Sequence, residues 1–244
     1  MKAVITAGGP IDGEYARAAG TTLKALAPVR GRTMLARTIE AVRELGVRRI
    51  AVVGNEAIRS ACETSVERIV PDAGSGTGNV VAALEAWAED GDPLLYLTCD
   101  MPYVGVASLR DFVNRTPSDA LAMPLCEHAA FVERFAGAPD FGITLGGERV
   151  VNGGAFHIPA GAAHRIGSFA TQLFEARKAP WRMATIAGPL LLLRFAIKRL
   201  SIAQLEMRGR ALLNVPVLAV RACMPELGYD ADSVEEYRYA RHHS

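Results

Sequence analysis

A glycine-rich loop with a lysine at its far end is the first place where the sequence suggests chemistry. The apolar run Ala3-Val4-Ile5 leads into Ala7-Gly8-Gly9, and Lys24 closes the loop. Because glycine has no Cβ, backbone amides at such a turn can approach phosphate oxygens closely. Arg17 or Lys24 would then neutralise the phosphates. The glycines follow neither the Walker nor the dinucleotide-binding spacing, so the stretch is either a cradle for a nucleoside triphosphate or an ordinary surface loop.

An aspartate directly behind a buried strand is the second candidate. Pro93–Thr98 is nearly all apolar, as expected of a central parallel strand that is covered on both faces, and Cys99-Asp100 follows it. A carboxylate there lies at the carboxyl edge of the sheet, where ligands bind in open α/β folds. Mg²⁺ prefers few protein carboxylates together with phosphate oxygens of a substrate. Asp100 is therefore either a magnesium ligand or a cap for the turn before Met101-Pro102.

A second glycine-rich loop covers residues 74–79 and reads "GSGTGN". Its three glycines would let the backbone lie flat against a planar base or a ribose. Ser75 or Asn79 could then read the edge of a base. Gly74, Ser75, Gly76 and Asn79 are therefore candidates for nucleotide binding, and the alternative is a plain loop that leads into a helix.

The elements that must position these residues alternate between strand and helix in the first half of the chain. Predicted strands are Lys2–Thr6, Arg49–Val53, Glu67–Val70 and Pro93–Thr98, and predicted helices are Thr33–Leu45, Val80–Glu89 and Val106–Asn114. This alternation indicates a three-layer α/β domain with right-handed crossovers.

The second half of the chain is less regular and is expected to complete the same domain, which would span residues 1–244. Predicted strands are Asp119–Pro124, Phe131–Phe135, Gly142–Leu145, Ala155–Ile158 and Val215–Ala222. Predicted helices are Gly161–Arg177, Leu190–Arg199, Ser201–Arg210 and a last helix that opens at Ser233, the latter two with capping-box patterns.

Composition argues against several classes of protein. Half of the 244 residues are apolar and the formal net charge is +1, so charge alone predicts neither nucleic-acid binding nor a broad attraction to membranes. The four cysteines are scattered without a CxxC pair, which argues against a zinc site or a disulfide framework. This pattern favours a location in the reducing cytoplasm. No signal peptide is expected, and the longest apolar run, residues 189–197, is broken by Arg194 and too short to span a bilayer.

Taken together, the motifs resemble those of the MobA-like and sugar-phosphate nucleotidyltransferases. The chain has the family's initial strand and glycine pair, then an arginine, and seven residues later a lysine, here Arg17 and Lys24. Three further stretches resemble the family's aspartate motif, its acceptor-lining segment and its closing segment: "LTCDMPYV" (Leu97–Val104), "NGGAFHI" (Asn152–Ile158) and "GYDADSVEEY" (Gly228–Tyr237).

The resemblance implies a three-layer α/β/α Rossmann-like fold of the GT-A type with a mostly parallel sheet. The chain departs from the pattern in three places. The loop between Gly9 and Arg17 is longer than usual, and Leu23 stands where the family has proline. An extra C-terminal helical stretch at about residues 180–212 is expected to form either an acceptor lid or the surface of a homodimer.

The resemblance also implies a reaction, in which a nucleoside monophosphate moves from a triphosphate to a phosphorylated small-molecule acceptor and pyrophosphate leaves. Lys24 would contact the α-phosphate, Arg17 would cover the β and γ phosphates, and Asp100 would hold Mg²⁺ together with Asp230 or Asp232. Nucleotide-binding candidates are Ala7, Gly8, Gly9, Gly74, Ser75, Gly76 and Asn79, and acceptor-binding candidates are Asn152, Gly153 and Gly154.

Two rival interpretations stay open. Asp230-Ala231-Asp232 spells the DxD metal motif of GT-A glycosyltransferases, although that motif normally follows the central strand, where this chain has Cys99-Asp100. The other rival is a catalytically inactive nucleotide-binding module. Such a module would need to have lost the lysine at position 24 or the acid at position 100, and this chain has both. Arg194, Lys198 and Arg199 are candidates for binding the acceptor's phosphate, with plain surface solvation as the alternative. Replacing Lys24 by alanine is expected to leave thermal stability nearly unchanged, because the loop buries little.

Overall fold

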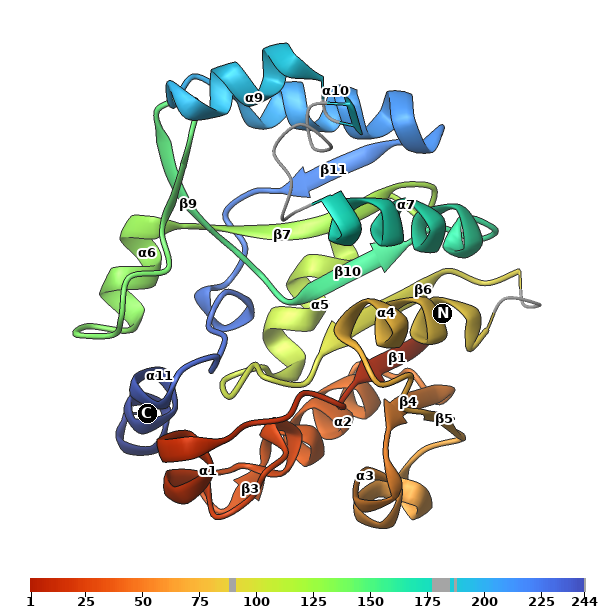
Figure 1. Ribbon diagram of the computed structural model, residues 1–244, viewed down its shortest axis with the longest axis vertical. Coiled ribbons are helices and arrows are strands. Elements are labelled where there is room, and N and C mark those ends of the chain that lie inside the picture. Colours follow the sequence, from red (N-terminus) through yellow and green to blue (C-terminus); the bar gives the residue numbers. More distant parts are fainter. Residues whose placement is uncertain (88–90, 177–184, 187, 244) are drawn as a thin grey trace.

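The computed structural model describes residues 1–87, 91–176, 185–186 and 188–243 (Figure 1). Within these residues nine strands form one mixed sheet, and helices cover both of its faces. The strand order is β5-β4-β1-β6-β10-β7-β9-β8, and β11 lies beside β7. The predicted three-layer, Rossmann-like α/β fold is confirmed.

Four parallel strands form the half of the sheet that carries the candidate site. They are β1 (Lys2–Thr6), β4 (Ile50–Gly54), β5 (Arg68–Pro71) and β6 (Leu94–Thr98), with nearly the predicted bounds. β1 lies between β4 and β6 and pairs with both in parallel. Because all four strands run in one direction, the residues that follow them meet at one edge of the sheet.

Side chains alternate along these strands and fill two separate hydrophobic cores. Ala3 and Ile5 belong to the core under α2 (Met34–Glu44), α3 (Glu56–Cys62) and α5 (Val106–Asn114). Val4 belongs to the core under α4 (Gly76–Glu85) and α7 (Ala163–Ala176). Both faces of this half are therefore covered, which explains why its strands are apolar almost without interruption.

The second half of the sheet is mixed. Its strands are β7 (Leu121–Glu127), β8 (Ile143–Leu145), β9 (Glu148–Asn152), β10 (Ala155–Ile158) and β11 (Val217–Val220). β10 runs antiparallel to β6 and pairs Ala155 with Leu97. The amino end of β10 therefore lies at the carboxyl edge of the parallel strands and brings Gly153-Gly154 to the edge that carries Asp100.

The strand predicted at Phe131–Phe135 is wrong. The segment lies in α6 (His128–Arg134) and the residue after it. Phe131 and Phe135 stand four residues apart, with ring centroids 5.0 Å apart, which is the spacing of neighbouring side chains on one face of a helix. β9 is absent from the sequence-based prediction, although the pair Gly146-Gly147, both with positive φ, is a typical hairpin turn.

Shorter elements connect the sheet to its helices. Thr33 Oγ1 accepts a hydrogen bond from Ala36 N at 3.2 Å, so α2 begins at the predicted cap. The predicted start of α4 at Val80 is four residues late, since glycines occupy its first turn. Other short elements are α1 (Gly13–Ala19), the hairpin of β2 (Pro28–Val29) and β3 (Arg32–Thr33), and the 3-10 turns η1 (Lys24–Leu26), η2 (Glu63–Ser65) and η3 (Pro225–Leu227).

The helical extension expected at about residues 180–212 falls partly on residues 180–184 and 187, which lie outside the described residues. Its described part contains α9 (Pro189–Ala196) and α10 (Ile202–Leu213). Ser201 caps α10, and α10 packs beside β11. The last helix, α11 (Val234–His242), has the predicted capping box at Ser233. No helix in the described part of the chain combines the length and the apolar character needed to cross a membrane.

Candidate active site

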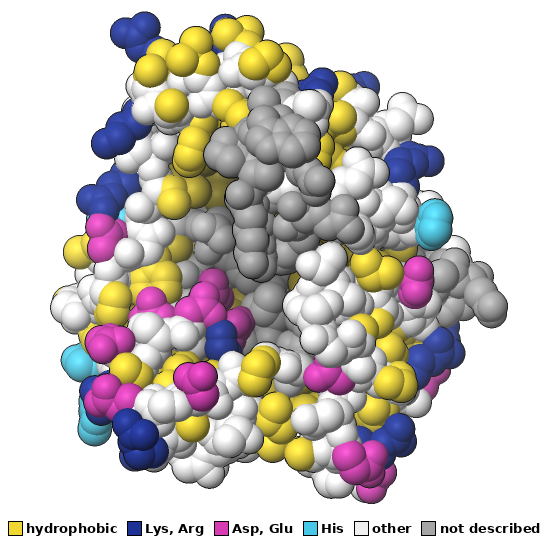
Figure 2. Space-filling view, in the orientation of Figure 1, with side chains coloured by type: hydrophobic (Ala, Val, Ile, Leu, Met, Phe, Trp, Pro, Cys, Tyr) yellow, Lys and Arg dark blue, Asp and Glu magenta, His cyan; other side chains and the backbone are white. Residues whose placement is uncertain are grey.

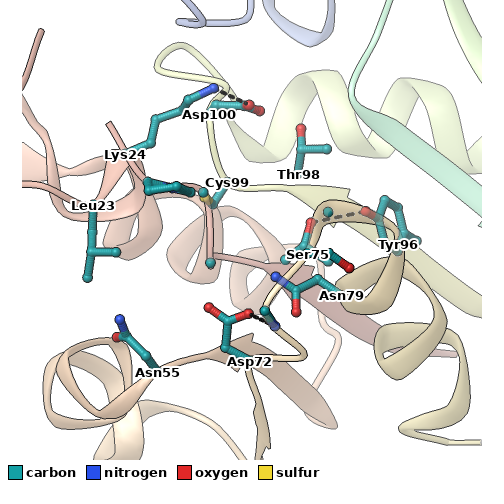
Figure 3. A pocket seen from close by; sticks show the side chains of 16 residues that line it. Leu23, Lys24, Asn55, Asp72, Ser75, Asn79, Tyr96, Thr98, Cys99 and Asp100 are labelled. Carbon is teal, nitrogen blue, oxygen red and sulfur yellow. Dashed lines mark hydrogen bonds and ion pairs between the residues drawn. The ribbon is translucent and has the colours of Figure 1, made fainter. Parts of the chain in front are cut away.

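A cavity of about 410 Å³ opens at the carboxyl edge of β1, β4 and β6. Lys24 and Asp100 lie at one end of it, and Asn55 and Asp72 lie at the other (Figure 3). The cavity joins both glycine-rich loops to the aspartate that follows the central strand. The described residues that line it are Thr6, Gly8, Gly9, Pro10, Leu23, Lys24, Asn55, Asp72, Gly74, Ser75, Gly76, Asn79, Tyr96, Thr98, Cys99 and Asp100.

The first glycine-rich loop is closed at its base, which explains how Lys24 reaches the cavity. Pro10 and Leu23 form an isolated β-bridge, and Lys24 N donates a hydrogen bond to Gly9 O at 3.0 Å. The residues between the two ends of the bridge fold into α1, which packs against α11. The extra length of the loop is therefore taken up by α1, whose Tyr15 and Ala19 join the main hydrophobic core, and Lys24 stays beside the glycine pair.

Lys24 lies between two carboxylates. Its Nζ is 3.3 Å from Asp100 Oδ2 and also contacts Asp232 Oδ1; the first of these pairs is drawn in Figure 3. The side chains of Lys24 and Asp100 are only 15% and 18% exposed, whereas that of Asp232 is 69% exposed. The ammonium group therefore forms a largely buried ion pair with Asp100 and a surface ion pair with Asp232.

Asp230 is the third carboxylate of this cluster, and its neighbours hold it in place. The preceding residue, Tyr229, is fully buried and packs against Phe131 and Phe135, with ring centroids 6.0 and 5.1 Å away. The following residue, Ala231, donates its N–H to Asp100 O at 2.9 Å. The closing segment of the chain is thus tied to the residue behind the central strand.

The cluster holds more acidic groups than basic ones. Burial raises the pKa of Asp230 well above its usual value, and the nearby charges of Asp100 and Asp232 raise it further. Burial lowers the pKa of Lys24, but the two carboxylates outweigh this effect, so the pKa is raised overall and the lysine is charged at neutral pH. Three carboxyl groups therefore share one ammonium group, and the cluster would be stabilised by a further cation.

Two of these carboxylates fit a divalent metal ion. Asp100 Oδ1 and Asp230 Oδ1 are buried and have no hydrogen-bond partner among the described residues, which is unfavourable unless a cation or water satisfies them. Carboxylate oxygens are the ligands that Mg²⁺ and Mn²⁺ prefer. The described residues contain no preformed group of three or more side chains that could hold a metal ion.

The N-terminus of α4 faces the other end of the cavity. Ser75 caps this helix and lines the cavity, while the buried Asn79 accepts a hydrogen bond from Ala73 N at 2.8 Å. A Cβ at Gly8 would lie 2.6 Å from Asn79 Nδ2 and 2.9 Å from Asp72 Oδ2. The lack of a Cβ at Gly8 therefore lets the first loop approach the side chains of the second this closely.

The candidate acceptor residues reach the same edge of the sheet from the antiparallel side. Thr98 N donates to Gly154 O at 2.9 Å, and a Cβ at Gly154 would lie 2.4 Å from Thr98 Oγ1 and 3.3 Å from Asp230 Oδ1. Gly154 thus lies between Thr98 of the central strand and Asp230 of the carboxylate cluster. Gly153 is buried beside it, whereas Asn152 is exposed at the end of β9, and all three lie outside the cavity lining.

Two predicted residues lie elsewhere. Ala7 is buried, and its N–H donates to Val53 O at 2.9 Å within the sheet, so this amide is already used. Arg17 is exposed on α1, outside the cavity lining. Lys24 is the one cationic side chain among the described residues that line the cavity. The role of Arg17 at the β and γ phosphates stays a prediction.

Several polar residues of the cavity were not predicted from the sequence. Thr6 Oγ1 and the Tyr96 hydroxyl are 3.0 Å apart, and burial raises the pKa of Tyr96 to about 12, so its hydroxyl is protonated. Tyr96 and Thr98 occupy alternate positions of an otherwise apolar strand, which places both on one face. Asn55 directly follows β4, as Asp100 follows β6, and the same edge argument would have identified it.

Comparison with known proteins identifies the family. Residues 3–242 match the family described as the MobA-like NTP transferase domain. The chain belongs to this family. The match includes both glycine-rich loops, Asp100 and the closing segment, so the MobA-like resemblance is confirmed over almost the whole chain. The family and the fold place the chain among the nucleotidyltransferases.

Individual relatives and solved structures show how far the similarity extends. The chain is 35% identical over 133 residues to the bifunctional protein GlmU from Aromatoleum aromaticum, which covers 53% of this chain and 28% of GlmU. The chain therefore spans less than a third of the length of this curated relative. A hypothetical transferase from Thermus thermophilus superposes with a TM-score of 0.83 at 27% identity, covering 97% of this chain and 100% of that one. The manganese complex of Rv0371C from Mycobacterium tuberculosis H37Rv shares the fold, with a TM-score of 0.54 at 19% identity and coverage of 98% and 97%.

Proposed function

We propose that this protein is a Mg²⁺-dependent nucleotidyltransferase that moves a nucleoside monophosphate from a nucleoside triphosphate to a phosphorylated small molecule and releases pyrophosphate. One observation carries the proposal. Lys24 Nζ and Asp100 Oδ2 lie 3.3 Å apart at the end of a cavity lined by two glycine-rich loops, where the lysine would bind phosphate and the aspartate a metal ion. These are the groups that phosphoryl chemistry needs, because catalysis there consists mainly of positioning and charge neutralisation.

The two ends of the cavity suit the two ends of a nucleotide. Lys24 and the amides of Gly8-Gly9 would hold the phosphates at one end. Asn55, Asp72 and Asn79 offer hydrogen-bonding groups for the base and ribose at the other. The cavity volume of about 410 Å³ lies within the range of small-molecule sites.

In the proposed reaction an oxygen of the acceptor's phosphate attacks the α-phosphorus of the triphosphate. The bond between the α-phosphorus and the oxygen that bridges to the β-phosphate breaks, and pyrophosphate leaves with that electron pair. The acceptor is then joined to the nucleoside through a new pyrophosphate linkage. Lys24 Nζ would stabilise the negative charge that builds up on the α-phosphate oxygens, and the backbone of Gly153-Gly154 would border the acceptor at the edge of the sheet that carries Asp100.

Asp100 and Asp230 would hold the metal ion, with Asp232 beside them. When bound, Mg²⁺ neutralises phosphate charge and makes the α-phosphorus easier to attack. Three carboxyl groups at the phosphate end would otherwise repel a triphosphate, so the charge of the cluster supports metal dependence. The manganese complex of Rv0371C supports a divalent ion in this fold.

A product assay tests the proposal. A thermal-shift screen of the four nucleoside triphosphates with Mg²⁺ first selects the base. The preferred triphosphate is then incubated with Mg²⁺ and a panel of sugar phosphates and polyol phosphates, and pyrophosphate is measured. We expect pyrophosphate only when protein, triphosphate, metal and acceptor are all present. Release of a nucleoside diphosphate from a nucleotide sugar would indicate a glycosyltransferase instead, and binding without any product would indicate an inactive module.

A further inference from the structure

The helical extension gathers most of the exposed large apolar side chains of the molecule. Among the described residues, six of the ten such side chains lie on α9, on the turn after it and on α10, and α9 contains no buried residue. They are 39–65% exposed and comprise Leu190, Leu193, Phe195, Ile197, Leu205 and Met207, here called the α9–α10 surface. Figure 2 shows a group of hydrophobic side chains at the top of the molecule, where Figure 1 places α9 and α10. A cluster of exposed apolar side chains of this kind marks an interaction surface.

Basic side chains border the α9–α10 surface. Residues 188–213 contain five basic residues and one acidic residue, a net charge of +4, whereas the whole chain carries +1. The acidic residue, Glu206, accepts a hydrogen bond from Ala219 N at 2.9 Å and so faces the sheet. Lys198, Arg199 and Arg210 are exposed, and none of them forms an ion pair with a described residue. Residues 188–213 are therefore a strongly basic region, although the net charge of the whole chain is close to zero.

One of these cations stands at a backbone position that disfavours it. Lys198 lies two residues after the end of α9 with φ +56°, and its N–H donates to Phe195 O at 2.9 Å. This left-handed conformation closes many helices and is usually adopted by glycine. Lysine at this position lowers stability relative to glycine, yet it places a charge on the turn beside the exposed Ile197. Folding alone therefore does not explain the residue.

We propose that the α9–α10 surface docks on a membrane rich in anionic lipids. Exposed apolar side chains bordered by unpaired basic ones are typical of helices that lie in a bilayer interface, where the apolar groups enter the acyl boundary and the cations meet lipid phosphates. α9 has eight residues, far fewer than a membrane span needs, so it would lie on the surface. A second copy of the chain fits less well, because two like-charged surfaces would face each other across a two-fold contact.

Flotation of the full chain with phospholipid vesicles tests this proposal. We expect binding to vesicles that contain phosphatidylserine in phosphatidylcholine, weaker binding to phosphatidylcholine alone, and release as the salt concentration rises. Phe195→Ser should weaken binding to the anionic vesicles by about tenfold. Val132→Ser, which removes a 49%-exposed apolar side chain from α6, should leave binding unchanged.

Lys198→Gly separates membrane binding from folding. Because glycine adopts the backbone conformation more easily, this variant should melt at the same or a higher temperature than the original protein while binding anionic vesicles more weakly. The proposal fails if the protein does not bind vesicles of either composition, or if Val132→Ser weakens binding as much as Phe195→Ser. It also fails if Lys198→Gly binds normally, or if size-exclusion chromatography shows a dimer that Phe195→Ser dissociates, since a second copy would then occupy the surface.

Discussion

Replacing Lys24 by methionine is the perturbation that most directly probes the carboxylate cluster. Methionine keeps much of the apolar length of the side chain and removes its charge. Asp100 would then lose its one cationic partner among the described residues, since Lys24 Nζ lies 3.3 Å from its Oδ2 in a pair whose side chains are 15% and 18% exposed. The structure therefore leads to a different expectation from the sequence, in which the loop buries little and the substitution has almost no effect on stability.

The size of the effect follows from burial and distance. At an effective dielectric constant of about 20, two charges at this separation attract by about 5 kcal/mol, and their desolvation offsets part of this. Removing one member of a buried ion pair costs about 3–5 kcal/mol. The pair with Asp232 adds little, because that side chain is 69% exposed. Since Asp100 keeps some contact with water, we expect a loss of about 3 kcal/mol, or a fall in Tm of roughly 6–12 °C.

Thermal and urea unfolding at pH 7 without metal ions measure this loss. The raised pKa of Lys24 means that its contribution is present below the unfolded-state value of 10.5 and disappears as the pH rises through the higher folded-state value, so pH 7 lies within the useful window. Arg48→Met, which removes an exposed cation before β4 at the opposite edge of the sheet, is the matched control. The double variant Lys24→Met/Asp100→Asn should recover most of the loss. A Lys24→Met variant as stable as the original protein, or one that Asp100→Asn does not rescue, would refute the reasoning.

Three further predictions concern the same edge of the sheet. Asp230→Asn should raise the Tm of the metal-free protein at pH 7, because the carboxyl group favours folding only below its unfolded-state pKa of 3.8 and loses that contribution as the pH rises through the raised folded-state pKa. The gain should disappear below about pH 4, and equal Tm values at pH 7 would contradict it. Gly154→Ala should lower the free energy of unfolding in urea by roughly 1–3 kcal/mol, since its Cβ would lie 2.4 Å from Thr98 Oγ1. An unchanged midpoint of urea unfolding would contradict this, because it would mean that the neighbouring atoms move aside at no cost. Asp100→Asn should abolish the Mg²⁺ dependence of triphosphate binding in calorimetry, whereas Asp92→Asn, at the other end of β6, should leave the metal titration as it was.

The sheet and the rim of the cavity are readable from the sequence for a simple reason. Buried parallel strands are continuous apolar runs with abrupt polar ends, so Lys2–Thr6 and Pro93–Thr98 stand out, and parallel direction brings their ends together. Gly8-Gly9 and Asp100 could therefore be placed at one edge without any tertiary information. The structure confirms this placement and adds Asn55 by the same rule.

Features that depend on long-range contacts could not be read in this way. The Pro10–Leu23 bridge closes the loop that contains α1, and no local sequence pattern predicts that pairing. Asp230 joins the cluster because Tyr229 is buried among aromatic rings contributed by distant segments. In contrast, the error at Phe131–Phe135 was local, because the four-residue spacing of its phenylalanines already favoured a helix.

A crystal structure with a non-hydrolysable nucleoside triphosphate and Mn²⁺ tests the central claim most directly. The anomalous signal of manganese locates the ion independently of the ligand. The account predicts a manganese peak within coordination distance of Asp100 Oδ1 and Asp230 Oδ1, with the triphosphate in the cavity and its α-phosphate beside Lys24 Nζ. A peak bound by neither carboxylate, or a nucleotide outside the cavity lined by Gly8-Gly9, would contradict it.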